Sequence, residues 1–367
     1  MEKLKVIISG GGTGGHIFPA LSIAGELRQR IPDCDILFVG ALGRMEMEKV
    51  PAAGFPITGL PVMGFPRKPG VAMLKFFVML WRSMIRARQI VRDFKPALVI
   101  GVGGYASGPL LRAAISRHIP ALIQEQNSYA GITNKLLGKR VNRICVAYEG
   151  MERFFPPEKI VLTGNPVRAN LLAPGATRRD ALLHFGLPEE GEVLLITGGS
   201  LGARSLNEAV LASLDAIGQA PWTVIWQTGS LYFGEMKDKT AGRLPGNLKI
   251  YQFLDRMELA YLAASVVISR AGAGTISELC IAAKPVILVP SPNVAEDHQT
   301  RNAMALASRE AAILISDADI RERLFPEADL LMRDPAKRNA LSGHISHLAM
   351  PGATTMIVDE ALQLIRS

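Results

Sequence analysis

The sequence predicts an α/β protein built from two Rossmann-like, doubly wound parallel-sheet domains that face each other across a cleft. Two observations indicate this class. Short runs rich in Val, Ile and Leu alternate with helical patterns through both halves of the chain, which is the rhythm of repeated βαβ units. The length of 367 residues matches about two domains at roughly 150 residues each. Ligands of such sheets bind beyond the carboxyl ends of the strands, so we expect the functional site there.

Five apolar runs in the first half are predicted to be buried parallel strands, at residues 4–9, 36–40, 97–101, 121–124 and 143–146. Helical patterns are found at residues 18–30, 45–53, 71–94, 107–117 and 132–137. These elements define an N-terminal domain over residues 1–165. A hinge is expected within residues 163–174, where Gly, Asn and two Pro occur together.

The second half repeats the pattern and defines a C-terminal domain over residues 166–350. Strands are predicted at residues 192–197, 223–227, 248–252, 266–269 and 285–289. Helices are predicted at residues 205–217, 275–282 and 300–308. The last helix, near residues 353–365, follows a Pro-Gly pair, and we expect residues 353–367 to pack back on the N-terminal domain.

The composition excludes several classes of protein. Hydrophobic residues make up 49% and charged residues 20%, which excludes a disordered chain. Three widely spaced cysteines cannot form a disulfide framework or a cysteine-rich zinc site, so a reducing, cytosolic compartment is expected. No secretory signal is expected, because the apolar run at residues 1–8 is cut by Ser9 and glycines. No stretch reaches the roughly 20 apolar residues of a membrane span.

The net charge of +8 is distributed unevenly. Residues 1–165 carry 22 Lys and Arg against 11 Asp and Glu, whereas residues 166–367 carry 19 against 22. The excess of positive charge therefore lies in the first half. This asymmetry predicts an anionic partner for that half, which could be a nucleic acid, a membrane or a phosphorylated substrate.

The first glycine-rich loop, GGGTGGH at residues 10–16, follows a strand and opens a helix. It fits G-x-G-x-x-G, and its backbone N–H groups are suited to phosphate. A dinucleotide site also needs an acidic residue at the end of the second strand to hold the ribose. That strand ends in Gly40 and Ala41, and the nearest acids, Asp33 and Asp35, precede it. Phosphate binding is therefore favoured over NAD binding.

Further polar loops follow other strands. They are GGYASGP at residues 103–109, GGSLGAR at 198–204, RAGAGTISE at 270–278 and DHQTRN at 297–302. Repeated strand–glycine loop–helix units indicate a ligand with more than one phosphate. Glu278, on the first turns of a helix, is suited to accept two hydrogen bonds from a ribose diol, or alternatively to cap the helix dipole. The 297–302 segment is suited to sugar hydroxyls, or is simply a polar helix start.

Together these segments resemble the MurG family of peptidoglycan glycosyltransferases. The matching segments run in family order: GGGTGGHIFPAL at 10–21, GRME at 43–46, GGYASGP at 103–109, QEQN at 124–127, GNPVR at 164–168, GGSLGAR at 198–204, RAGAGTISEL at 270–279 and EDHQTRNA at 296–303. The resemblance implies the GT-B fold, with UDP-GlcNAc mainly on the C-terminal domain and the lipid acceptor on the N-terminal domain. It implies an inverting hexosyltransferase that moves GlcNAc to the C4 hydroxyl of MurNAc in lipid I, which gives lipid II for peptidoglycan synthesis.

The resemblance also implies site residues. The positions that match the family's donor-binding residues are Thr13, Gly14, Gly15, Asn127, Arg168, Ser200, Leu254, Ala273, Gly274, Thr275, Ile276, Ser277, Glu278 and Gln299. The positions expected to bind the acceptor are Gly103, Gly104, Tyr105 and Ser107. Gln252 and Phe253, beside Leu254, depart from the family's local pattern, and His298 stands where some members have Gln.

Transfer with inversion needs a base for the acceptor hydroxyl and stabilisation of the departing diphosphate. His16 is the first candidate for the base, because an ordinary His pKa suits proton transfer at neutral pH. Binding the diphosphate and positioning the acceptor are alternative roles for His16, and Glu125 is a rival base or a partner of His16. Glycine-loop amides and a helix N-terminus can stabilise the diphosphate, so no obligatory metal and no cofactor are expected.

The helical pattern at residues 71–94 predicts membrane contact. Residues 67–95 carry one acid, Asp93, and eight basic residues: Arg67, Lys68, Lys75, Arg82, Arg86, Arg88, Arg92 and Lys95. Apolar side chains lie among them: Phe76, Phe77, Leu80 and Trp81. Such a helix can lie in an anionic interface, or it can be a sheet-covering helix with a solvated basic face. A lipid-linked acceptor favours a peripheral protein on the cytoplasmic face of the cell membrane.

The sequence disfavours three alternative functions. Another GT-B transferase with a different lipid or natural-product acceptor is disfavoured by the GGYASGP and QEQN segments. A dinucleotide-dependent oxidoreductase is disfavoured by the missing acid after the second strand. A nucleic-acid-binding protein is suggested by charge alone, and no nucleic-acid module is recognised. The expected partners are UDP-GlcNAc, lipid I, an anionic membrane surface and other cell-wall synthesis and division proteins.

Overall fold

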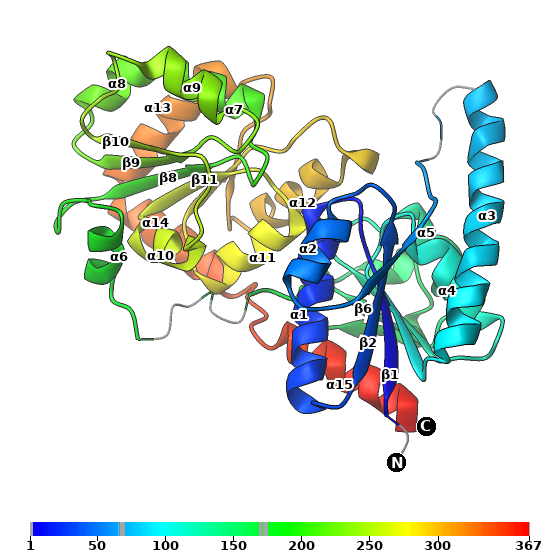
Figure 1. Cartoon of the computed structure of the whole chain (residues 1–367). Coiled ribbons are helices and arrows are strands. Elements are labelled where there is room, and N and C mark those ends of the chain that lie inside the picture. Colours follow the sequence, from blue (N-terminus) through cyan, green and yellow to red (C-terminus); the bar gives the residue numbers. More distant parts are fainter. Residues whose placement is uncertain (1–2, 65, 67–69, 169–170, 172–174, 367) are drawn as a thin grey trace. The chain divides into compact units, whose positions relative to one another are not determined.

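The computed structural model describes residues 3–64, 66, 70–168, 171 and 175–366 (Figure 1). The chain divides into two compact units. The N-terminal unit contains residues 1–167 together with 350–367, and the C-terminal unit contains residues 168–349. Each unit is organised around its own parallel sheet, and each is described by itself below.

The N-terminal unit contains a seven-stranded parallel sheet in the order β3-β2-β1-β4-β5-β6-β7. Its strands are β1 (Lys5–Ser9), β2 (Asp35–Ala41), β3 (Ile57–Leu60), β4 (Leu98–Gly101), β5 (Ala121–Glu125), β6 (Arg143–Val146) and β7 (Ile160–Leu162). Its helices are α1 (Gly14–Arg30), α2 (Glu46–Ala52), α3 (Val71–Phe94), α4 (Ser107–Ile115), α5 (Ile132–Gly138) and α15 (Ala353–Arg366). Two short 3₁₀ turns, Met151–Arg153 and Pro157–Lys159, precede β7.

The strand order reverses between β1 and β4, as in a doubly wound sheet. Helices cover both faces of this sheet, and each face has its own apolar core. The C-terminal helix α15 packs beside α1 (Figure 1), where Ile357, Val358 and Ala361 join the core behind β1. Two ion pairs tie α15 to this unit, because Asp359 pairs with Arg30 and Glu360 pairs with Arg143.

The C-terminal unit contains a six-stranded parallel sheet in the order β10-β9-β8-β11-β12-β13. Its strands are β8 (Val193–Thr197), β9 (Thr223–Gln227), β10 (Leu248–Tyr251), β11 (Val266–Ser269), β12 (Val286–Leu288) and β13 (Ile313–Leu314). Its helices are α6 (Arg178–His184), α7 (Arg204–Ala212), α8 (Leu214–Gln219), α9 (Phe233–Thr240), α10 (Met257–Ala263), α11 (Ala273–Ile281), α12 (His298–Ala307), α13 (Ile320–Arg333) and α14 (Pro335–Ser346).

The doubly wound prediction is confirmed in both units, and several predicted boundaries are wrong. The helix expected at residues 18–30 begins four residues earlier, so His16 lies in its first turn. The helix expected at residues 205–217 is two helices, α7 and α8, because Ser213 leaves helical geometry and its hydroxyl bonds the Ala209 carbonyl. Five of the expected hinge residues, 169–170 and 172–174, lie outside the described residues.

Candidate functional site

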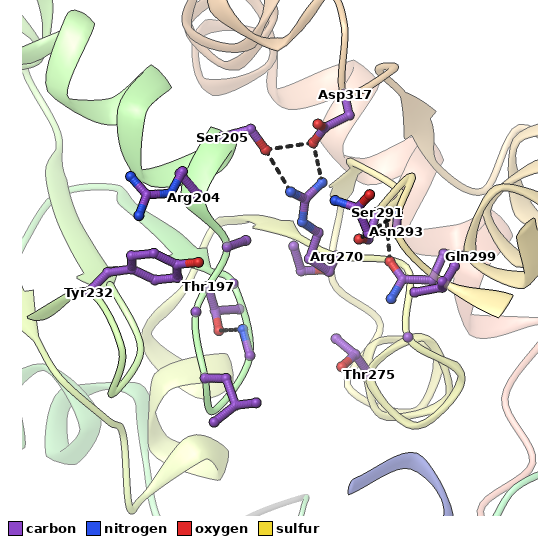
Figure 2. A pocket seen from close by; sticks show the side chains of 18 of the residues that line it. Thr197, Arg204, Ser205, Tyr232, Arg270, Thr275, Ser291, Asn293, Gln299 and Asp317 are labelled. Carbon is purple, nitrogen blue, oxygen red and sulfur yellow. Dashed lines mark hydrogen bonds and ion pairs between the residues drawn. The ribbon is translucent and has the colours of Figure 1, made fainter. Parts of the chain in front are cut away.

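A polar pocket of about 660 Å³ opens at the carboxyl ends of β8 and β11 in the C-terminal unit (Figure 2). One wall is the glycine-rich loop after β8, and another is the start of α11. Residues that line it include Thr197, Gly198, Gly199, Leu201, Gly202, Arg204, Ser205, Tyr232, Arg270, Thr275, Ser291, Asn293, Gln299 and Asp317. The pocket lies where the strand order reverses, the usual ligand position in such a sheet.

The loop after β8 needs glycine because it lies against the loop after β9. A Cβ on Gly202 would come 2.1 Å from the Thr228 carbonyl oxygen, and the φ of Gly202 is +89°. Gly229, on the facing loop, is equally crowded by the Gly202 backbone. Ser200, a predicted donor residue, stands exposed between the lining residues Gly199 and Leu201, and its carbonyl accepts from the Ser230 N–H.

Arg270 lines this pocket and connects several of the segments around it. It was not predicted as a site residue. Its guanidinium donates to Asp317 Oδ1 at 2.5 Å and to Ser205 Oγ at 2.7 Å. It also donates to the carbonyls of Val289 and Pro290, both at 3.1 Å. This one cation, only 13% exposed, thereby joins the start of α7, the residues just after β12 and the loop before α13, as Figure 2 shows in part.

The start of α11 supplies the other predicted donor positions. Gly272 caps the helix and Thr275 lines the pocket, while Ala273 and Ile276 are buried and Ser277 bonds the Ala273 carbonyl. Gly274 meets no atom within 4 Å where a Cβ would lie. A helix N-terminus at the pocket wall presents unpaired N–H groups and a positive dipole end, which favour an anionic ligand.

Gln299 lies in the first turn of α12 and lines the same pocket. Its Oε1 accepts from the Ser291 N–H at 2.8 Å, which fixes the orientation of the amide. Glu296 and Asp297, just before α12, both have φ above +50°, a strained conformation for residues with a side chain. Strain of this kind at a pocket rim is typical of a functional loop.

Glu278 lies one helical turn beyond Thr275, in a cluster with Arg168 and Tyr261. Its Oε1 accepts from Arg168 Nε and its Oε2 accepts from the Tyr261 hydroxyl, both at 3.1 Å. Burial raises the pKa of Glu278 above the usual glutamate value, and burial also raises the pKa of Tyr261. Leu254, the predicted uracil contact, is buried at the loop before α10.

Two glycine loops of the N-terminal unit touch each other. A Cβ on Gly104 would come 2.4 Å from the Gly11 carbonyl oxygen, and a Cβ on Gly103 would come 2.8 Å from His16 Nε2. The buried carboxylate of Glu46, in the GRME segment, accepts from the N–H groups of Gly12 and Ala41. Glu46 therefore fixes the first loop, a role that was not predicted for it.

His16 lies in the first turn of α1, beside Thr13, Gly14 and Gly15. Its Nδ1 is 3.0 Å from the Gly11 carbonyl oxygen. A carbonyl can only accept, so this hydrogen bond assigns the proton to Nδ1 and the lone pair of the neutral ring to Nε2. The Nε2 and Cδ2 edge of the ring faces Gly103.

Among the other predicted residues of this unit, some side chains are exposed to a ligand and others are buried and hydrogen-bond the loops. Tyr105 is exposed, whereas Ser107 is fully buried with its Oγ within 2.9 Å of the Ser9 and Gly103 carbonyls. Glu125 is also buried, and its carboxylate accepts from the Asn127 and Gly131 N–H groups and from Asn134 Nδ2. Ser107 and Glu125 are thus placed to hold loops, and Glu125 holds the turn that carries Asn127.

Helix α3 has a buried face and an apolar face in solvent. Ser83, Ala87, Ile90 and Val91 cover the sheet. Phe77, Leu80 and Trp81 are exposed, Trp81 by 66%, and Phe76 is half-buried with its ring 5.5 Å from Phe77. Arg82 and Arg86 are also exposed. Arg67 and Lys68 lie outside the described residues. No helix among the described residues is long and apolar enough to cross a membrane.

Two sequence features bear on metal binding. Among the described residues no cluster of three or more His, Cys, Asp or Glu is placed to hold a metal ion. The sequence contains Asp317-Ala318-Asp319, but the two carboxylates have separate partners: Asp317 pairs with Arg270, and Asp319 accepts from Ser316 Oγ at 2.7 Å. The three cysteines are buried free thiols.

Fold and pocket place the chain in the GT-B class of two-domain enzymes. The crystal structure of MurG from Acinetobacter baumannii has the same fold, with a TM-score of 0.78 and 28% identity over 98% of this chain and 99% of that one. The glycosyltransferase family 28 N-terminal domain matches residues 6–146, and the family 28 C-terminal domain matches residues 193–349.

Curated relatives match the chain along its whole length. The UDP-N-acetylglucosamine--N-acetylmuramyl-(pentapeptide) pyrophosphoryl-undecaprenol N-acetylglucosamine transferase of Parabacteroides distasonis is 52% identical over 100% of this chain and 99% of its own. The protein of the same name from Bacteroides fragilis is 53% identical over 99% of this chain and 96% of its own. The chain belongs to glycosyltransferase family 28 and, within it, to the MurG family.

Proposed function

We propose that this protein transfers GlcNAc from UDP-GlcNAc to the C4 hydroxyl of MurNAc in lipid I and so makes lipid II. The observation that carries the proposal is the full-length correspondence with relatives whose names state this transfer. The resemblance covers both the glycine loops of the N-terminal unit and the pocket of the C-terminal unit. The protein is thereby an inverting hexosyltransferase of peptidoglycan synthesis.

The donor binds in the pocket of the C-terminal unit. The N–H groups of the 198–203 loop and of the α11 N-terminus bind the diphosphate, and the Gln299 amide binds the sugar. Glu278 accepts hydrogen bonds from the ribose diol, with Arg168 beside it, and the Leu254 backbone contacts uracil. Ser200, Thr275 and the other predicted donor residues complete the set.

The acceptor hydroxyl attacks C1 of GlcNAc in line as UDP leaves, which inverts the anomeric centre. His16 Nε2 accepts the hydroxyl proton, because the Gly11 carbonyl holds the ring proton on Nδ1. Gly103, Gly104 and Tyr105 bind the acceptor. The negative charge that develops on UDP is stabilised by N–H donors and a helix dipole, so the reaction needs no resident metal.

The acceptor is lipid-linked, so we propose that the protein works as a peripheral protein at the cytoplasmic membrane surface. The exposed apolar side chains of α3 enter the interface, and Arg82 and Arg86 contact anionic headgroups. Other cell-wall synthesis and division proteins are the proposed partners.

The test is a transfer assay with radiolabelled UDP-GlcNAc and a lipid I analogue, with UDP-GalNAc as the control donor. We expect one labelled disaccharide product per UDP released and a β-1,4 linkage by NMR. Turnover with UDP-GalNAc at an equal rate would contradict the donor assignment. Release of free GlcNAc or of an epimerised sugar nucleotide, without a disaccharide, would contradict the transfer itself. The reaction repeated in EDTA tests the metal expectation, and we expect full activity.

A further inference from the structure

A second pocket, of about 220 Å³, lies at the amino-terminal ends of the strands in the C-terminal sheet. Glu192 precedes β8, Ser265 precedes β11 and Lys284 precedes β12, and all three line it. Arg178 at the start of α6 and Arg338 on α14 form its sides. The donor pocket lies at the other ends of the same strands, roughly 16 Å away for a five-residue strand.

Three cations and one carboxylate line this pocket. The carboxylate, Glu192, is already paired with Arg338 at 2.7 Å, and Arg338 is only 12% exposed. Within the described part of the chain, neither Arg178 nor Lys284 has a carboxylate at ion-pair distance. Two positive charges in one small pocket therefore lack a counter-charge.

Lys284 has unused hydrogen-bonding capacity. Its Nζ donates to the Ala264 carbonyl at 2.8 Å, its one hydrogen bond within the described residues, although an ammonium has three N–H donors. Burial, together with the charge of Arg178, lowers the pKa of Lys284 to about 8. A partly buried ammonium beside a second cation is unfavourable until an anion binds between them.

We propose that this pocket is a second anion site, which binds one compact divalent oxyanion, such as a phosphate group, between Lys284 and Arg178. The donors for its oxygens are the remaining N–H groups of Lys284 and those N–H groups of Arg178 that do not bond the Gly191 carbonyl. The volume of the pocket, a third of that of the donor pocket, is enough for one tetrahedral oxyanion. The proposal is independent of the GlcNAc transfer.

The direct test follows the ¹³Cε resonance of Lys284 with pH, in the full-length protein and with UDP filling the donor pocket. Sulfate is the probe, because it stays a dianion and takes up no proton in this range. We expect a pKa of about 8 without sulfate and a higher pKa with sulfate, because a bound anion favours the charged lysine. A Lys284 pKa that does not move during the sulfate titration overturns the proposal.

Two variants provide the matched comparison. Lys284→Met identifies the resonance. In calorimetric titrations, this variant should bind sulfate about tenfold or more weakly, the usual loss for a charge-assisted hydrogen bond. Lys249→Met removes the same charge from an exposed position on β10 and should bind sulfate as the wild type does. An equal loss of sulfate affinity in both variants would show that net charge controls sulfate binding, and it would overturn the proposed site. Both variants should keep GlcNAc transfer, which separates this result from the proposed function.

Inorganic phosphate and adenosine monophosphate distinguish the source of the anion. If the free ion binds this pocket, inorganic phosphate shifts the Lys284 resonance at the lower concentration. If the natural ligand is a phosphomonoester, adenosine monophosphate does so instead. If the Lys284 resonance shifts with neither inorganic phosphate nor adenosine monophosphate, the proposal is overturned.

Discussion

The Tyr261 hydroxyl lies 3.1 Å from Oε2 of Glu278, and the tyrosine side chain is almost completely buried. The other carboxylate oxygen of Glu278 accepts from Arg168, whose side chain is 42% exposed. Glu278 is therefore held by one fixed partner inside the core and by one partner at the surface. In the proposed donor complex, a ribose diol replaces the outer partner, and Tyr261 keeps the carboxylate in place.

Tyr261→Phe should weaken donor binding and leave the chemical step almost unchanged. The variant keeps the ring but leaves one oxygen of a buried carboxylate without a donor, a loss of about 1–3 kcal/mol. Because the effect acts on ribose recognition, we expect KM for UDP-GlcNAc to rise about tenfold with kcat within about twofold. Steady-state kinetics of GlcNAc transfer measures both constants.

Tyr251→Phe is the matched control for this change. Its hydroxyl donates a long bond of 3.4 Å to the Phe185 carbonyl in the same unit, away from Glu278. We expect wild-type KM in this variant. A drop in kcat at constant KM for Tyr261→Phe would assign the tyrosine to the chemical step and contradict its positioning role.

Uridine binding should weaken as the pH falls. Burial raises the pKa of Glu278 above its ordinary value of 4.5, so Glu278 becomes protonated at a higher pH than an exposed glutamate. Above that folded pKa the carboxylate accepts from both ribose hydroxyls, and below it the negative acceptor is lost. Uridine titrates no group of its own in the acid range, so NMR titration of uridine reports the protein alone. Glu278→Gln should bind uridine weakly and independently of pH; the same slope in this variant would refute the assignment.

Asp317→Ala should destabilise the C-terminal unit, because it leaves the guanidinium of Arg270 buried without its carboxylate. Arg270 is 13% exposed and Asp317 is 23% exposed, so solvent screens the pair little. We expect a loss of about 2 kcal/mol and a melting temperature lower by roughly 4–8 °C. Calorimetry measures this change, and KM for UDP-GlcNAc should rise because the pocket wall loosens.

Asp329→Ala is the control for that variant. Asp329 pairs with Arg333 on the surface of α13, where the arginine is 58% exposed. Removing an exposed pair changes stability by about 0.5 kcal/mol or less. If both variants melt alike, the Arg270 network does not hold the pocket wall.

The sequence was sufficient to predict the central strands but not the edges of the sheets. β1, β4, β8 and β11 are buried on both faces, so they appear as continuous apolar runs. β3, β7 and β13 were missed because they are edge strands of two to four residues. Their side chains are mostly half-exposed, and nothing in a run that short separates a strand from a loop.

The sequence locates the glycine loops, because each loop is one segment with its own pattern, but it does not show contacts between distant segments. The glycine loops are visible in the sequence, because their φ angles and close contacts require glycine. Glu46 supports Gly12 from 34 residues away, and Arg270 meets Asp317 across 47 residues. Ser107 was expected to bind the acceptor, and Glu125 was expected as a rival base or a partner of His16. Only the folded chain shows that their polar atoms are engaged by backbone groups and, for Glu125, by Asn134.

Charge on α3 should control binding to anionic vesicles. The double variant Arg82→Gln/Arg86→Gln removes two exposed cations, each worth about 1 kcal/mol near an anionic surface, so partitioning should fall roughly 30-fold at low salt. High salt should release the wild type and erase the difference. Vesicle co-sedimentation measures this, with Arg243→Gln/Arg321→Gln, two exposed arginines of the other unit, as the charge-matched control. Equal loss in the control would mean that net charge, not α3, directs binding.

Gly103→Ala should reduce turnover by moving His16. The added Cβ would lie 2.8 Å from His16 Nε2, at a φ of +101°. The imidazole must move to relieve this contact. A misplacement of about 1 Å at a reacting group lowers the rate by about 10²-fold, so we expect kcat to fall while KM for UDP-GlcNAc stays constant. Gly150→Ala is the control, because it imposes similar backbone strain at φ +74° with no atom within 4 Å.

His16→Ala completes the comparison. General base catalysis contributes about 10²–10⁴ to a rate, and we expect a loss of that size in kcat. If Gly103→Ala acts only through His16, the double variant should be no slower than His16→Ala, because both changes remove the same interaction. If the losses in kcat multiply in the double variant, Gly103→Ala acts on the rate independently of His16. Activity of His16→Ala within a few-fold of wild type would exclude His16 as the base and return that role to another group of the acceptor site.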